Sequence, residues 1–172
     1  PKKNIPEPTI EFLKDSTAGH RRYVHLKITP NRRVNRYDVF APEKTQFHHL
    51  RANGVRRIGQ KGSLYERNST RILSYYVVNN QPLELSFDVP SKEALNMDLL
   101  ESSFDLLQHP DFGLKKRENW MIPMPFVLTD AIILHQKIKP SLAVLPQKIA
   151  VSLRPKMMQD SIKIARDSTA QH

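Results

Sequence analysis

The chain has 172 residues, of which 39% are hydrophobic and 13 are proline, and it contains no cysteine. This length suffices for one domain with a hydrophobic core, whereas the composition excludes a low-complexity chain, disulfide bonds and thiolate catalysis. No apolar run approaches the roughly 18–20 residues that a membrane-spanning helix needs. The chain opens at Pro1 without an initiator methionine or an apolar leader, so we expect a fragment of a longer protein.

Strand patterns dominate the first third of the chain. Apolar and polar residues alternate in three segments, which predicts half-buried strands at residues 9–13, 23–29 and 36–41. Two β-hairpins are expected to follow. The first has arms at residues 47–52 and 55–58 around Asn53-Gly54, the pair that a type I′ turn prefers. The second joins residues 72–78 to residues 83–89, the most regular strand pattern in the chain.

Residues 95–107 fit two structures. Leu95, Met97 and Leu99 have strand spacing, whereas Met97, Leu100, Phe104 and Leu107 have helical spacing. We predict a strand to about Ser102; the alternative is a mixed α+β fold in which this segment is a helix on one sheet face. Residues 131–138 alternate again and predict the last strand.

About eight short strands with turn signals between them predict an all-β protein, an antiparallel β-sandwich. We expect a linker at residues 1–8, the sandwich at residues 9–138, and a basic tail or extension at residues 139–172 whose structure the sequence predicts poorly. The expected core consists of Val24, Leu26, Ile28, Leu83, Leu85, Phe87, Ile132 and Leu134.

The formal net charge of +10 is concentrated in one third of the chain. Residues 20–71 carry thirteen Lys or Arg side chains against three acidic ones, whereas acidic side chains exceed basic ones by four in residues 72–138. Such asymmetry is typical of a surface that meets nucleic acid, anionic lipid or an acidic partner domain, with a merely solvated face as the alternative. Candidate contacts with an anionic surface are Arg21, Arg22, Arg32, Arg33, Arg36, Arg56 and Arg57.

Nucleic acid is the less favoured of these partners. Proteins that bind single strands stack bases on several exposed aromatic side chains. In the basic third of the chain only Tyr23 is expected to face solvent beside arginines. Anionic lipid is therefore the preferred polyanion, because a polybasic surface gains about 1 kcal/mol per charge near such a membrane.

No catalytic residue and no metal ligand is assigned. His48 and His49 are adjacent in a predicted strand, where neighbouring side chains point to opposite faces, so the two rings are not expected to share an ion. Zinc also needs three or four convergent ligands. The chain has no Gly-x-Ser-x-Gly, no phosphate loop and no dinucleotide fingerprint.

Residues 117–130 combine Trp120 and Met121 with Pro123 and Pro125, which predicts a rigid crossover because proline fixes φ and extends the preceding residue. We expect Trp120, Met121 and Met124 to plug one end of the sandwich; a partner-binding patch is the alternative.

This crossover and its strand complete a series of segments in a characteristic order: Pro8–Ser16, Arg22–Thr29 with Arg32 and Arg33, the Asn53-Gly54 turn, and Leu83–Val89. In that order, from Pro6 to Ile138, the chain resembles the C-terminal extracytoplasmic β domain of bacterial membrane-bound zinc exopeptidases, metallopeptidase family twenty-eight. His109-Pro110-Asp111 echoes a His-x-Asp among the zinc ligands of that family. It is better explained as a Pro-Asp turn, since no Glu-Glu pair occurs in the chain.

The resemblance implies a non-catalytic accessory domain of a hydrolase. It would pack on the peptidase or membrane domain of the same polypeptide, or on the membrane surface, on the extracytoplasmic, periplasmic side. Zinc is expected in the parent's peptidase domain and no cofactor in this chain, so the isolated chain should show neither hydrolysis nor stoichiometric zinc. The alternative is a stand-alone basic module that binds nucleic acid or another polyanion.

Overall fold

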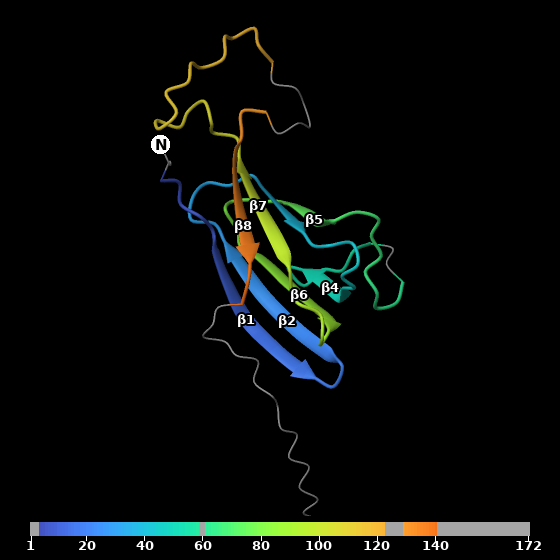
Figure 1. Ribbon diagram of the computed structural model, residues 1–172. Helices are drawn as coiled ribbons and strands as arrows, with labels where there is room; N and C mark the ends of the chain where they lie inside the picture. Colours follow the sequence, from blue (N-terminus) through green and yellow to red (C-terminus); the bar gives the residue numbers. More distant parts are fainter. Residues whose placement is uncertain (1–3, 59–60, 123–128, 141–172) are drawn as a thin grey trace, which may run out of the picture.

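The computed structural model describes residues 4–58, 61–122 and 129–140. Within these residues the chain forms eight strands and no helix, and the strands build two antiparallel sheets of four that pack face to face (Figure 1). The predicted all-β antiparallel sandwich is therefore confirmed, and the helix considered for residues 95–107 is not formed. The described residues contain no helix long and apolar enough to cross a membrane.

Sheet A has the strand order β1-β2-β6-β4. Its strands are β1 (Thr9–Ala18), β2 (Arg21–Thr29), β6 (Leu83–Pro90) and β4 (His48–Ala52). The two central strands place their apolar residues opposite one another, in the pairs Val24–Phe87, Leu26–Leu85 and Ile28–Leu83. All six side chains are at most 4% exposed, so these pairs form the sheet A side of the core.

Sheet B has the strand order β5-β3-β7-β8. Its strands are β5 (Arg71–Tyr76), β3 (Arg36–Phe40), β7 (Met97–Ser103) and β8 (Ile132–Ile138). Its contribution to the core comes from buried residues on all four strands, including Tyr37, Val39, Ile72, Met97, Leu99 and Ile138.

Seven of the eight predicted core residues are buried, each at most 5% exposed. Leu134 is only half-buried, because β8 is an edge strand with a neighbour on one side only. Phe47, which was not among the predicted core residues, is fully buried and packs edge-to-face on Phe87 with ring centroids 5.1 Å apart.

The first predicted hairpin is only half formed. Asn53 and Gly54 have the positive φ values that the turn requires, 48° and 79°, and Ala52 and Val55 exchange both backbone hydrogen bonds at 2.9 Å. Residues 55–58 nevertheless form no strand beyond this one bridge. The second arm was predicted wrongly because Arg56 and Arg57 leave it without an apolar face, and Ile58 is 96% exposed.

The second predicted hairpin, between residues 72–78 and 83–89, is wrong. β5 lies at the edge of sheet B beside β3, whereas β6 lies in sheet A between β2 and β4. Asn79 and Asn80, both with positive φ, carry the chain from one sheet to the other. Alternation predicted both strands correctly, but alternation specifies which face is buried and not which strand lies alongside.

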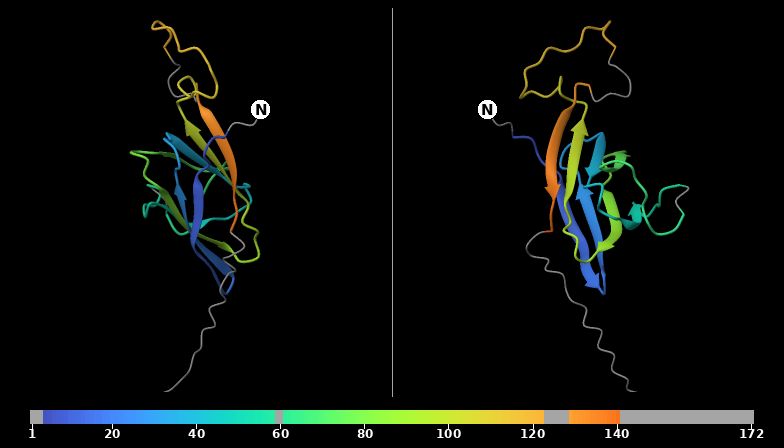
Figure 2. Two further views of the ribbon diagram at one scale, coloured as in Figure 1. Left: turned by 90° about the vertical axis from the view of Figure 1, so that its left-hand side faces the viewer. Right: turned by 45° about the vertical axis from the view of Figure 1, so that its right-hand side comes forward.

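A long connection joins β7 to β8, and its described residues 104–122 project beyond the end of the sandwich (Figures 1 and 2). The expected plug is wrong for Trp120 and Met121, which are 74% and 39% exposed, because the connection extends away from the sheets. Met124 and residues 123–128 of the expected crossover lie outside the described residues, as does the predicted tail beyond residue 140.

Candidate functional site

Four of the seven arginines proposed as anion contacts are paired with carboxylates of the same chain. Arg21 donates to Asp88, Arg22 to Asp15, Arg32 to Glu101 and Arg36 to Asp38, over donor–acceptor distances of 2.6–2.8 Å. The four carboxylate side chains are at most 4% exposed. A buried carboxylate is stable only when it is paired, so these arginines neutralise internal charge.

The other three arginines lie in connections. Arg56 donates to the carbonyl of Gly62. Arg57 donates to the carbonyl of Glu66 at 3.1 Å and lies over the ring of Tyr65. Arg33 is exposed and has no ion pair within the described residues.

The seven arginines do not form one cluster. Arg21 and Arg22 begin β2, whereas Arg32 and Arg33 follow its other end, roughly 30 Å away at the rise of an extended strand. Asp88 and Glu101, the partners of Arg21 and Arg32, lie 67 and 69 residues further along the chain. The acidic excess of residues 72–138 was the only sequence signal of this pairing.

Glu101 lies on the core side of β7, opposite Tyr37 of β3, and is fully buried. Burial raises the pKa of Glu101 above its ordinary value, against the opposing attraction of Arg32. Burial and then the charge of Glu101 raise the pKa of Tyr37 as well. The ion pair between Arg32 and Glu101 joins the β2–β3 connection to β7. The raised pKa keeps Tyr37 neutral.

The outer face of sheet A carries a groove with a volume of about 450 Å³. Its shape follows from two β-bulges, one on each flanking strand. β1 has one residue more than β2 between Phe12 and Lys14, and β4 has one more than β6 between His48 and Arg51. Because bulges bend and twist a strand, the outer strands curve around β2 and β6.

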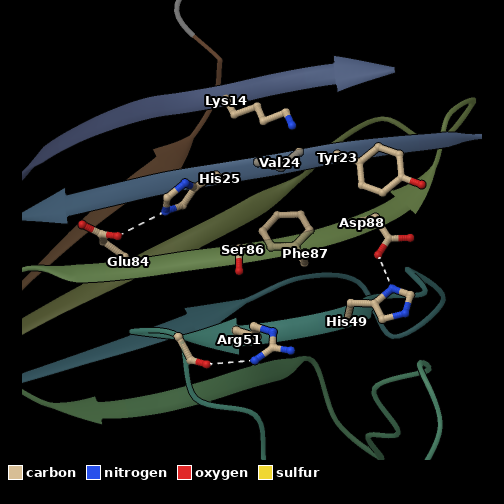
Figure 3. Close-up of a pocket in the computed structure, with 11 residues that line it drawn as sticks. Lys14, Tyr23, Val24, His25, His49, Arg51, Glu84, Ser86, Phe87 and Asp88 are labelled. Carbon is tan, nitrogen blue, oxygen red and sulfur yellow. Dashed lines mark hydrogen bonds and ion pairs between the residues drawn. The ribbon is translucent and has the colours of Figure 1, made fainter. Parts of the chain in front are cut away.

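Four residues form one row across this groove. Lys14 pairs with His25, His25 with Ser86, and Ser86 with Arg51, so the row runs over β1, β2, β6 and β4 in register. Figure 3 shows Lys14 at one rim, Arg51 at the other and His25 and Ser86 between them. Tyr23, which is 42% exposed as expected from its outward position, adds an aromatic ring to the groove.

Both carboxylates of the groove are held by neighbours. Asp88 accepts from Arg21 and contacts Nδ1 of His49, each at 2.7 Å. Glu84 lies 3.2 Å from Nε2 of His25. Lys14 has no ion pair within the described residues, and Arg51 donates only to the carbonyl of Gly54, at 3.1 Å.

The two adjacent histidines do not follow the regular strand geometry that the sequence predicted. His49 has φ of 51° at the bulge, so the alternation of side chains is interrupted there. His49 contacts Asp88, whereas Nδ1 of His48 lies 3.2 Å from the hydroxyl of Ser63. Burial lowers the pKa of His48, with Arg21 adding to the effect. Across the described residues no group of three or more potential ligands is arranged to hold a metal ion.

These features define an all-β sandwich with a polar groove on one sheet and an exposed apolar connection at one end. Comparison with protein-family models, with curated proteins and with solved structures gives no match.

Proposed function

We propose that the chain is a non-catalytic accessory domain that docks onto a neighbouring domain of its own polypeptide. One observation carries this proposal: large apolar side chains are exposed along residues 104–122, hereafter the docking loop. Their exposed fractions run from 39% to 86%, for Phe104, Leu114, Trp120, Met121 and Ile122.

The docking loop is unusual for a compact sandwich. Connections longer than about 12–15 residues without helix or strand are typically functional, and the described part of this connection contains only turns and irregular backbone. Burying each large apolar side chain contributes roughly 1.5–3 kcal/mol. Covering Trp120 and Ile122 together would thus stabilise a contact substantially.

The charges of the docking loop indicate the kind of surface that it fits. Lys115 and Lys116 are exposed and have no ion pair within the described residues. Arg117 donates to Asp130 at 2.7 Å and ties the outgoing and returning arms of the connection together. The complementary surface is therefore an apolar depression with an acidic group where it faces Lys115 and Lys116.

The resemblance to the C-terminal β domain of membrane-bound zinc exopeptidases supports a peptidase domain as this neighbour. In that setting the domain lies on the extracytoplasmic, periplasmic side, and zinc belongs to the peptidase domain. The internal pairing of four candidate arginines also supports this reading over a polyanion-binding module, because paired charges contribute less to steering and phosphate contact.

Lysine-directed cross-linking of the intact polypeptide, followed by mass spectrometry, tests the proposal. Lys115 and Lys116 should link to residues outside this chain, whereas Lys92, in the turn at the other end of β7, should not. Replacing Ile122 with Ser should reduce those links, and the same change at Val78, another exposed aliphatic residue but outside the docking loop, should not.

Three results would contradict the proposal. The first is a set of links from Lys115 and Lys116 that stays within the chain. The second is a gene that encodes no other domain. The third is co-sedimentation with anionic vesicles that is lost in Ile122→Ser, which would assign the docking loop to the membrane surface.

A further inference from the structure

We propose that the groove on sheet A binds a small soluble phosphate ester with an apolar body. The row Lys14–His25–Ser86–Arg51 supplies the contacts to the phosphate, and the ring of Tyr23 packs on the apolar part. This inference is independent of the docking loop.

The donors of the row suit a tetrahedral anion. Lys14 and Arg51 approach from opposite rims, and the Ser86 hydroxyl lies between them on β6 (Figure 3). Ammonium, guanidinium and hydroxyl groups are the ordinary donors to phosphate oxygens. A phosphate offers terminal oxygens in several directions, so it can accept from both rims and from the strand between them.

The two rim cations are available for a ligand. Lys14 is exposed and has no ion pair within the described residues, while Arg51 uses one nitrogen for the carbonyl of Gly54. The negative charge of Asp88 is compensated by Arg21, Nδ1 of His49 also contacts this carboxylate, and the Asp88 side chain is only 4% exposed. Glu84 is the remaining acidic group in the groove, and its side chain is 42% exposed.

The shape of the groove also fits a small molecule. Its volume of about 450 Å³ lies within the roughly 300–1,000 Å³ typical of ligand pockets. Lys14 and His49 lie at the two bulges, and bulges commonly re-aim side chains beside functional sites. His49 holds a left-handed backbone there, a conformation that concentrates at such sites.

Isothermal titration of the full chain with phenyl phosphate tests the proposal. We expect saturable binding that is tighter than that of inorganic phosphate, because only phenyl phosphate has an aromatic ring to pack on Tyr23. The affinity should fall as salt is added. Lys14→Gln and Arg51→Gln should each lower the affinity about tenfold or more. Glu84→Gln should raise the affinity, since it removes a half-exposed negative charge that lies beside His25 in the groove.

Lys92→Gln is the matched control, because Lys92 is an exposed lysine outside the groove, and circular dichroism verifies that each variant is folded. The proposal is overturned if Lys14→Gln and Arg51→Gln bind as the unmodified chain does, or if no variant shows saturation. Equal affinity for benzoate and phenyl phosphate would refute the assignment to phosphate. Binding only to anionic vesicles would refute a soluble ligand. Trp120→Ser should leave the titration unchanged, so this experiment tests the groove independently of the proposal for the docking loop.

Discussion

Four buried carboxylates each form an ion pair with one arginine: Asp15, Asp38, Asp88 and Glu101. An unpaired buried carboxylate costs several kcal/mol, so every one of these residues requires a cation close by. The basic excess of residues 20–71 is thus in part the counterpart of carboxylates inside the same fold. At the residue scale, arginine identity predicts charge, but only the structure says which arginines are available to a partner.

Replacing Asp88 with Asn should destabilise the chain by roughly 1–3 kcal/mol, because Arg21 and His49 both lose their charged acceptor. Asp98 provides a matched control. It also joins a histidine and a cation, His135 and Lys137, but its side chain is 27% exposed rather than 4%. Asp98→Asn should cost at most about 1 kcal/mol. Urea unfolding measures both, and equal losses would contradict the role assigned to burial.

Glu101 should make stability depend on pH. Because burial raises its pKa above the ordinary value of 4.5, the folded chain retains this proton at pH values where the unfolded chain has lost it. The contribution of Glu101 is therefore fully present below 4.5 and is lost as the pH rises through the raised pKa. The difference in unfolding free energy, wild type minus Glu101→Gln, should therefore fall as the pH rises above 4.5. A difference that is flat or rises with pH would show that Arg32 outweighs burial.

At the scale of elements, regular alternation predicted the central strands well. From Val24 in β2 and throughout β6 every second residue is apolar, and all of these residues are buried. The second half of β1 escaped prediction because its inward residue Asp15 is polar and is buried only through Arg22. Both bulges were also missed, since an extra residue in a strand changes no residue type. The groove depends on those bulges and therefore could not be predicted from the sequence.

Asn53 does more than the turn that the sequence predicted. Its side chain accepts from the backbone of Glu84 at 2.7 Å and donates to the hydroxyl of Tyr75 at 3.0 Å, so it joins the turn to both sheets. Asn53→Ala should cost roughly 1–2 kcal/mol.

Asn79→Ala should cost less, although Asn79 has a similar positive φ of 51°, because its side chain has no hydrogen bond within the described residues. Thermal unfolding compares the two variants. Equal losses would mean that the left-handed backbone alone sets the cost and that the bonds of Asn53 contribute little.

At the scale of the whole molecule, the core closes without the docking loop. Trp120→Ala should change the unfolding free energy of the isolated chain by no more than about 0.5 kcal/mol, as for other exposed positions. Phe47→Ala, another aromatic truncation but at a fully buried position, should cost about 3–5 kcal/mol. Chemical unfolding of both variants checks this. A large loss of unfolding free energy for Trp120→Ala would show that Trp120 packs in the core.

Hydrogen exchange of the docking loop tests the central claim most directly. The backbone amides of residues 104–122 should exchange quickly in the isolated chain, where few of them have backbone partners, and should become protected in the intact polypeptide. Residues 91–96, at the opposite end of β7, serve as the internal reference and should exchange equally in both. Protection of residues 104–122 confined to the intact polypeptide is the result that the account predicts. Equal exchange of these residues in both proteins would contradict it.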